Sequence, residues 1–199
     1  MSNPPQIDSV DIIITGRGGQ GTKLAAQLLA SAAAVDGYFP LHYSVYGALV
    51  RGGDIASTVV IDSQRPRCAL RDSFSIMVAA HNNWFARYYD LLDPGGTLLY
   101  DPATVAQSLL TRADLRHCPI AAGALASAAG DPRAGNMVLA GACASFALVP
   151  SLASLGGAMT SVVPAHREDR IRRNLDAVSA GWHWGEQVRS QDALVVARD

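Results

Sequence analysis

The feature that most constrains the fold is an apolar run that passes directly into a glycine-rich loop and then into a helix-forming segment. Residues 10–15 (VDIIIT) are mostly β-branched, which is typical of a strand buried on both faces of a parallel sheet. Residues 16–21 (GRGGQG) form the loop, and residues 23–35 are rich in alanine and leucine, which favour a helix. A second strand is predicted at residues 38–43, after a helix stop at Gly37. This β–α–β order predicts an α/β domain.

The rest of the chain continues the same pattern and favours one domain. Further strands are predicted at residues 54–62, 73–80, 97–100 and 118–121. Helices are predicted at residues 81–92 (followed by a turn at 93–96), at 136–149, between Pro150 and Pro164, and at 167–182. We therefore expect a single Rossmann-like, doubly wound α/β domain with a mostly parallel sheet and a C-terminal helical segment, covering residues 10–186 between tails at 1–9 and 187–199.

The charge composition excludes several classes of function. The 199 residues carry 16 Lys+Arg against 17 Asp+Glu, a net charge of -1, which argues against a basic nucleic-acid or membrane surface. Charged residues make up 17% of the chain, below the ~25% usual for soluble domains. The uncharged stretch 134–166 has an apolar centre, 137–149, which is shorter than the ~20 residues of a membrane span, so we expect a buried helix there. A chain this poor in charge is expected to have much of its surface covered by partners.

The three cysteines do not form a metal-binding pattern. Cys68, Cys118 and Cys143 are far apart in the sequence, and no C-x-x-C motif occurs. We therefore expect no iron–sulfur cluster and no metal site within this chain. Scattered cysteines in odd number also favour a reducing, cytoplasmic location.

The glycine loop alone leaves several functions open. Gly16, Gly18 and Gly21 match G-x-G-x-x-G, and the helix that follows would offer free N–H groups to an anion. The competing interpretation is that the glycines only pack the helix onto the strand. An NAD site would need an acid at the end of the second strand, and residues 41–44 (LHYS) contain none. A Walker A loop is excluded because Lys23 is not followed by Ser or Thr.

Two glycine motifs together are more specific than either alone. The segment 16–21 (GRGGQG) is followed by the segment 46–53 (YGALVRGG). This pair resembles the G-x-G-G-Q-G … Y-G-x-x-x-R-G-G pattern of the gamma subunit of 2-oxoacid:ferredoxin oxidoreductases, and the resemblance extends over residues 10–183, including 136–142 (NMVLAGA). The chain departs from the family around the tyrosine loop, where Ser44, Val45, Ala48 and Leu49 replace the usual Pro and Glu.

The resemblance implies a role in a larger enzyme. Such enzymes decarboxylate a 2-oxo acid oxidatively to an acyl-CoA, CO2 and two electrons. Thiamine diphosphate, Mg2+ and [4Fe-4S] clusters are held by partner subunits, coenzyme A is a co-substrate, and the gamma chain packs on the catalytic thiamine-binding subunits of a complex that also has an iron–sulfur subunit. The resemblance thus implies a chain with no catalytic residues of its own. Two alternatives remain: a free-standing nucleotide- or flavin-dependent reductase, or a scaffold subunit that touches no ligand.

The candidate cofactor-binding residues lie in the two glycine motifs. Arg51 is expected either to clamp a carboxylate or phosphate or to order its own loop. Gln20 is expected to cap its loop, Tyr46 to pack, and Lys23 to be a surface or phosphate-facing charge. The full candidate set is Gly16, Gly18, Gly19, Gln20, Gly21, Tyr46, Gly47, Arg51, Gly52 and Gly53.

Overall fold

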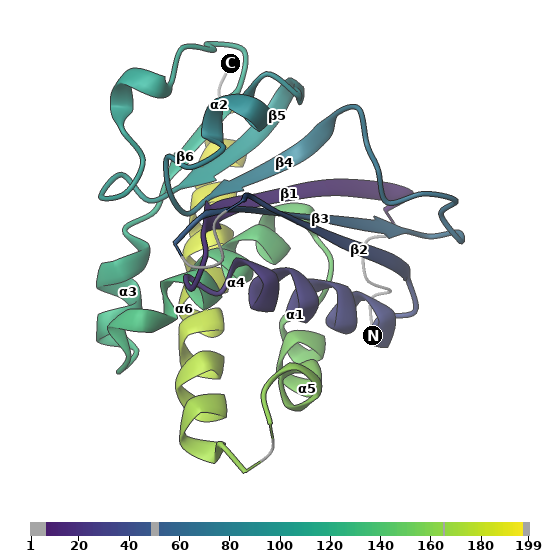
Figure 1. Cartoon of the computed structure of the whole chain (residues 1–199), viewed down its shortest axis with the longest axis vertical. Helices are drawn as coiled ribbons and strands as arrows, with labels where there is room; N and C mark the ends of the chain where they lie inside the picture. The colour runs from purple at the N-terminus through teal and green to yellow at the C-terminus, as the bar shows by residue number, and fades with distance from the viewer. Residues whose placement is uncertain (1–6, 49–51, 165, 197–199) are drawn as a thin grey trace.

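The protein is an α/β structure with one six-stranded sheet (Figure 1). The computed structural model describes residues 7–48, 52–164 and 166–196, so Arg51 lies outside the described residues. The strands are β1 (Ser9–Arg17), β2 (Phe39–Tyr46), β3 (Asp54–Asp62), β4 (Phe74–Ala79), β5 (Leu92–Tyr100) and β6 (Arg116–Pro119). The helices are α1 (Thr22–Val35), α2 (Phe85–Tyr89), α3 (Ala122–Ala128), α4 (Gly135–Ala147), α5 (Leu152–Val162) and α6 (Glu168–Val196), with short 3-10 turns η1 (Gln107–Leu109) and η2 (Pro132–Ala134).

The sheet is mostly parallel, as predicted, with one antiparallel strand inside it. The strand order is β2-β3-β1-β4-β5-β6, and β1, β4, β5 and β6 pair in parallel. Strand β3 is antiparallel to both of its neighbours, β1 and β2. Strand β2 therefore runs parallel to β1, which confirms the predicted β–α–β unit, but β3 lies between them.

Helices cover the two faces of the sheet unequally. The larger hydrophobic core packs α1, α3, α4, α5 and α6 against one face, while the smaller core packs α2 against the other (Figure 1). In α4, ten of the thirteen residues are buried, which confirms the core helix expected in the uncharged stretch. Among the described helices, none combines the length and apolarity that a bilayer crossing requires.

Helices α4 and α6 lie in unusually close contact because each helix places a glycine against the backbone of the other. A Cβ added to Gly181 on α6 would lie 2.7 Å from the carbonyl carbon of Val138 on α4. A Cβ on Gly141 of α4 would likewise lie 2.9 Å from the carbonyl carbon of Val178 on α6. The two helices can approach this closely only because neither contact position carries a side chain.

Three boundaries predicted from the sequence were wrong. The helix expected at 81–92 shortens to α2, because residues 81–84 form a loop in which His81 accepts a hydrogen bond from the Asn83 amide (3.2 Å) and Trp84 has φ 55°. The turn expected at 93–96 is part of β5, where Gly95 donates its N–H to the Asp114 carbonyl (3.0 Å). The terminal helix does not stop at residue 182 but continues through the expected tail to residue 196.

A contact between distant elements accounts for the longer terminal helix. Asp192 of α6 forms an ion pair with Arg116 of β6. The Arg116 guanidinium also lies 4.6 Å from the centroid of the Phe146 ring, which in turn packs near Trp184 of α6. Tertiary contacts of this kind stabilise a helix even where the local sequence favours it only weakly. The periodicity of apolar residues along α6 alone does not reveal them.

Candidate functional site

The two glycine motifs lie side by side in the folded chain. Gly18 donates its N–H to the Gly53 carbonyl (2.7 Å), and the Arg17 side chain donates from Nε to the Gly52 carbonyl (3.1 Å). Gly47 N–H closes the second loop onto the Asp54 carbonyl (2.8 Å). The antiparallel register of β1 and β3 explains this meeting, because it brings the end of β1 next to the start of β3.

Glycine is required at several positions of the first loop. Gly19 and Gly21 have φ 96° and 78°, values that side chains with a Cβ rarely adopt. A Cβ on Gly16 would lie 2.6 Å from the hydroxyl oxygen of Thr22. Gln20 Oε1 accepts a hydrogen bond from the Arg17 amide (2.7 Å), which confirms that this side chain caps its own loop. The loop is therefore fixed by internal contacts.

Asn136 anchors the glycine loop from a distant helix. It lies in the first turn of α4, and its Nδ2 donates to the Gly21 carbonyl (3.2 Å). A Cβ on Gly21 would collide with the Asn136 amide. Asn136 belongs to the family-like segment 136–142 but is not one of the site residues named from the sequence. The available signal was a single amide at the start of an otherwise uncharged core helix.

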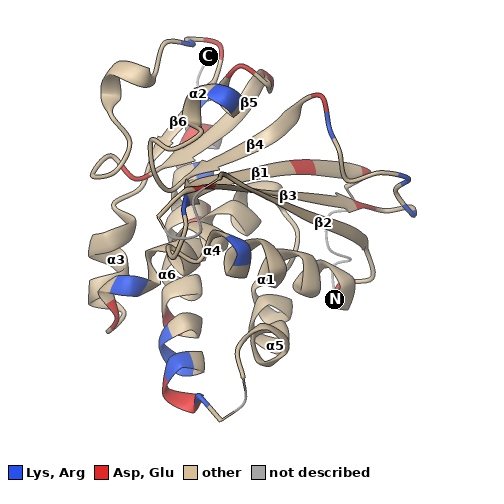
Figure 2. Cartoon of the chain, viewed as in Figure 1, with Lys and Arg blue, Asp and Glu red and all other residues tan. Residues whose placement is uncertain are grey.

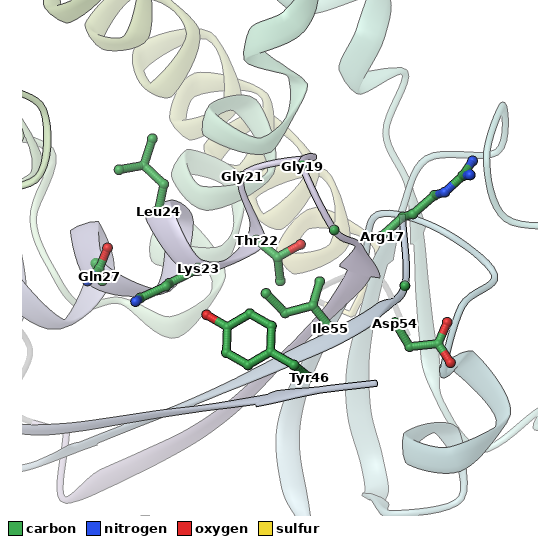
Figure 3. Close-up of a pocket in the computed structure, with 12 residues that line it drawn as sticks. Arg17, Gly19, Gly21, Thr22, Lys23, Leu24, Gln27, Tyr46, Asp54 and Ile55 are labelled. Carbon is green, nitrogen blue, oxygen red and sulfur yellow. The ribbon is translucent and has the colours of Figure 1, made fainter. Parts of the chain in front are cut away.

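A hollow lies between the two glycine loops and α1 (Figure 3). Its volume is about 610 Å³, and Lys23, Leu24 and Gln27 of α1 face Tyr46 of β2 and Ile55 of β3 across it. Tyr46 is 58% exposed, so it is a wall of the hollow rather than a core side chain. We call this space the α1 pocket. Its mix of apolar walls and a few polar groups is typical of a small-molecule site.

Two smaller hollows share the apex of the first glycine loop. One, of about 340 Å³, lies where β1, β4 and β5 end and is bordered by Ala80, Asp101 and Gly123. The other, of about 420 Å³, lies between the loop apex and the first turns of α6. Residues Gly19 and Gln20 border both. In open α/β sheets, ligands bind at the carboxyl ends of strands where the strand order reverses, which here is the β1–β4 boundary.

The polar groups around the α1 pocket favour an anion over a cation. Two basic residues, Arg17 and Lys23, line the pocket against one carboxylate, Asp54, and α1 has no acidic residue in its first turn. Burial lowers the pKa of His42 on β2, and the positive charge of Lys23 lowers it further. His42 Nε2 lies 3.0 Å from the Ser44 hydroxyl, which lies 2.8 Å from the Ser57 hydroxyl, so this imidazole is held in a chain of polar groups.

Among the described residues, no cluster of side chains fits a metal ion, and the two buried cysteines do not fit the role of a nucleophile. Within them, no three His, Cys, Asp or Glu side chains are arranged to hold a metal ion. Burial raises the pKa of Cys118 to about 11 and that of Cys143 to about 12. Both thiols therefore stay protonated at neutral pH, and a thiolate is the form needed for metal binding or nucleophilic attack.

The structure brings together most of the residues singled out from the sequence. All candidates in the described part of the chain, which excludes Arg51, belong to the two adjoining loops. The pocket adds residues that the sequence analysis did not include in the candidate set: Arg17, Thr22, Lys23, Leu24, Gln27, Asp54 and Ile55. Those on α1 follow the glycine loop directly, and the helical spacing of Lys23 and Gln27 was the available signal.

The whole folded unit matches one family of proteins. A sequence model of the pyruvate ferredoxin/flavodoxin oxidoreductase family matches residues 11–184. The chain belongs to this family. The match covers both glycine loops, Asn136 and most of α6, and it confirms the resemblance drawn from the two glycine motifs.

Relatives within the oxidoreductase family differ in length. The chain is 31% identical to the 2-oxoglutarate synthase subunit KorC of Methanothermobacter marburgensis, over 86% of this chain and 94% of that protein. It is 28% identical to the ketoisovalerate oxidoreductase subunit VorA of Methanothermobacter thermautotrophicus, over 92% of this chain but only 38% of that protein. The family domain thus occurs both as a separate chain and as part of a longer one.

A solved structure has the same fold over nearly its whole length. The gamma subunit of a keto/oxoacid ferredoxin oxidoreductase from Geobacter sulfurreducens is 26% identical and superposes with a TM-score of 0.75, over 89% of this chain and 99% of that one. The overall α/β architecture is therefore shared with an oxidoreductase gamma subunit.

Proposed function

We propose that this chain is the gamma subunit of a multi-subunit 2-oxoacid oxidoreductase. The complex would decarboxylate a 2-oxo acid oxidatively to an acyl-CoA, with release of CO2 and two electrons. Family membership supports this role, as does the likeness to a separate gamma subunit along nearly its whole length. Its place would be the cytoplasm, and its partners the thiamine-binding catalytic chains and an iron–sulfur chain.

The observation that carries a ligand-binding role is the meeting of the two glycine loops beside the α1 pocket. Loops built for close backbone approach, a lysine and a volume of about 610 Å³ fit part of a phosphorylated co-substrate such as coenzyme A. The candidate contacts are the residues of the two glycine motifs named from the sequence, together with Lys23 and Gln27. Arg51, which belongs to the second glycine motif in the sequence, would be a further anion clamp.

The chemistry itself would belong to the partners. Thiamine diphosphate, Mg2+ and [4Fe-4S] clusters would be held there, since the described residues of this chain offer no ligand set for a metal. Thiamine diphosphate would supply the carbanion chemistry of decarboxylation. This chain would bind and orient the co-substrate, and its glycine loops would exclude water from the acyl-transfer site.

A charge-removing substitution separates a ligand role from a scaffold role. In the assembled complex, Lys23→Gln should raise the KM for coenzyme A by about tenfold, the usual scale for a charge-assisted hydrogen bond, and leave kcat unchanged. Arg65→Gln is the matched control, because Arg65 is exposed in the β3–β4 connection, at the end of β3 opposite to the pocket. Unchanged KM values for both substrates in Lys23→Gln would favour a scaffold that touches no ligand.

The alternative that the chain is a free-standing reductase is tested by NADH binding. A free-standing nucleotide-dependent enzyme would bind NADH tightly as an isolated chain, which a fluorescence titration detects. We expect no such binding, since no acid ends β2 to hold the ribose hydroxyls.

A further inference from the structure

The pocket at the first turns of α6 is lined in part by residues that have no role in the proposed function. Its volume is about 420 Å³, and three segments far apart in sequence border it. The apex of the glycine loop forms one side, the turn that contains η2 forms the second, and the start of α6 forms the third. Figure 2 shows basic segments both on the turn after α3 and on the first turns of α6. We call this space the α6 pocket.

Arginines outnumber carboxylates in the α6 pocket. Arg133, Arg170 and Arg173 border it, against Asp131 and Asp169. Both carboxylates already have an arginine partner. Asp131 accepts from Arg133 through both of its oxygens (3.0 and 3.1 Å), and this pairing lowers the pKa of Asp131 to about 2. Asp169 lies 3.6 Å from Arg172, a residue that does not line the pocket.

Two guanidinium groups are therefore left without a counter-ion. Within the described residues, neither Arg170 nor Arg173 has an ion pair or a side-chain hydrogen bond. The nearby carboxylate of Asp131, whose pKa Arg173 also lowers, is already held at both oxygens by Arg133. The two arginines are one turn apart on α6, so their side chains project from the same face.

Beside the apolar side chains of Leu24 and Ala134, the remaining lining supplies neutral hydrogen-bond donors. Gln20, Asn136 and Asn174 contribute side-chain amides, and Asn174 is 6% exposed. Paired guanidinium groups with planar N–H donors match the oxygens of a phosphate group better than any other common ligand. A concave space of this size also fits a small molecule better than a flat protein contact.

We propose that the α6 pocket is a phosphate-binding subsite in which Arg170 and Arg173 bind the anion and Gln20 and Asn136 orient it. The phosphate group could belong to a free inorganic anion or to a phosphorylated co-substrate, and the two share the same recognition chemistry. The subsite borders the same glycine-loop apex as the α1 pocket, so one extended phosphorylated ligand could occupy both. In that case the inference deepens the proposed function and rests on it.

The test is a calorimetric titration of the full chain with inorganic phosphate and, separately, with coenzyme A. Arg170→Gln and Arg173→Gln should each weaken the binding of whichever probe occupies the site by about tenfold. Arg167→Gln is the matched control, because it removes the same charge from an exposed residue just before α6 that does not border the pocket. The affinity of Arg167→Gln for either probe should equal that of the wild-type chain.

The results separate the two sources and can overturn the site. If coenzyme A binds much more tightly than phosphate, and both arginine substitutions weaken its binding, the subsite is assigned to a co-substrate. Phosphate binding as tightly as coenzyme A assigns it to a free anion. No binding of either probe by the wild-type chain, or an equal loss in Arg167→Gln, would refute the subsite. Because binding is measured on the chain itself, this result is independent of whether the assembled complex oxidises a 2-oxo acid.

Discussion

The close contact between α4 and α6 makes a sharp prediction for one glycine. In Gly181→Ala, the new methyl group would lie 2.7 Å from the Val138 carbonyl carbon and 3.0 Å from its Cα, where ordinary contacts begin at 3.4 Å. Both neighbours are backbone atoms, so no side chain can rotate away, and the helices must move apart. Val138 and Val178 at this contact are almost fully buried, which means that separation also opens the main core.

Two opposing effects set the magnitude of the Gly181→Ala change. Alanine in place of a helical glycine stabilises by up to about 1 kcal/mol. Overpacking against a rigid backbone costs about 3 kcal/mol or more, the upper end for core insertions. The net loss is therefore about 2 kcal/mol, which corresponds to a fall in Tm of about 4–8 °C for a domain of this size.

A second helical glycine supplies the control. Gly157 lies within α5, is exposed, and a Cβ there would meet nothing within 4 Å. Gly157→Ala should therefore leave Tm unchanged or raise it. Thermal unfolding followed by circular dichroism measures both variants. If Gly181→Ala were as stable as Gly157→Ala, the α4–α6 contact would not be as close as described here.

Three further predictions concern thiols, pH and the core. Ellman's reagent at pH 8 should label Cys68 in the native chain but should label Cys118 and Cys143 only after unfolding. Burial shields the thiols of Cys118 and Cys143 and raises their pKa values. Rapid labelling of all three cysteines in the native chain would contradict this. The lowered pKa of Asp131 means that its ion pair stabilises the fold above the usual carboxyl pKa, about 3.9, and that this contribution disappears as pH falls towards 2. Asp131→Asn should thus flatten the loss of Tm between about pH 4 and pH 2 relative to wild type, and an unchanged slope would refute the assignment. Leu29→Ala should lower the free energy of unfolding in urea by about 2–5 kcal/mol, since Leu29 is fully buried, and a loss below about 1 kcal/mol would show a site that collapses easily.

Local sequence patterns were sufficient for the central part of the fold. The β-branched run at residues 10–15, the glycine loop and the alanine-rich helix each favour their observed state locally, and the uncharged segment at 136–149 could only be a core helix. The insertion of β3 between β1 and β2 was not foreseeable in this way. It depends on pairing partners, and residues 54–62 would look the same in a parallel strand.

Some residues of the candidate site could be recognised from local sequence, and others could not. The glycines were identifiable because positive φ values and close backbone approach have a direct signature in the sequence. Asn136, Arg170 and Arg173 reach the site from the second half of the chain, and only tertiary packing brings them to the glycine loop. Their local sequence contexts, the start of a core helix and a charged amphipathic helix, are ordinary.

The most direct test of the gamma-subunit role is reconstitution of 2-oxo acid oxidation with and without this chain. The partner chains that co-purify with it would first be identified by native mass spectrometry. Reduction of a viologen dye that depends on both a 2-oxo acid and coenzyme A would then be measured for the isolated chain, for the partners alone and for the complete complex. We predict activity only in the complete complex. Full activity of the partners without this chain, or robust activity of this chain alone, would contradict the account.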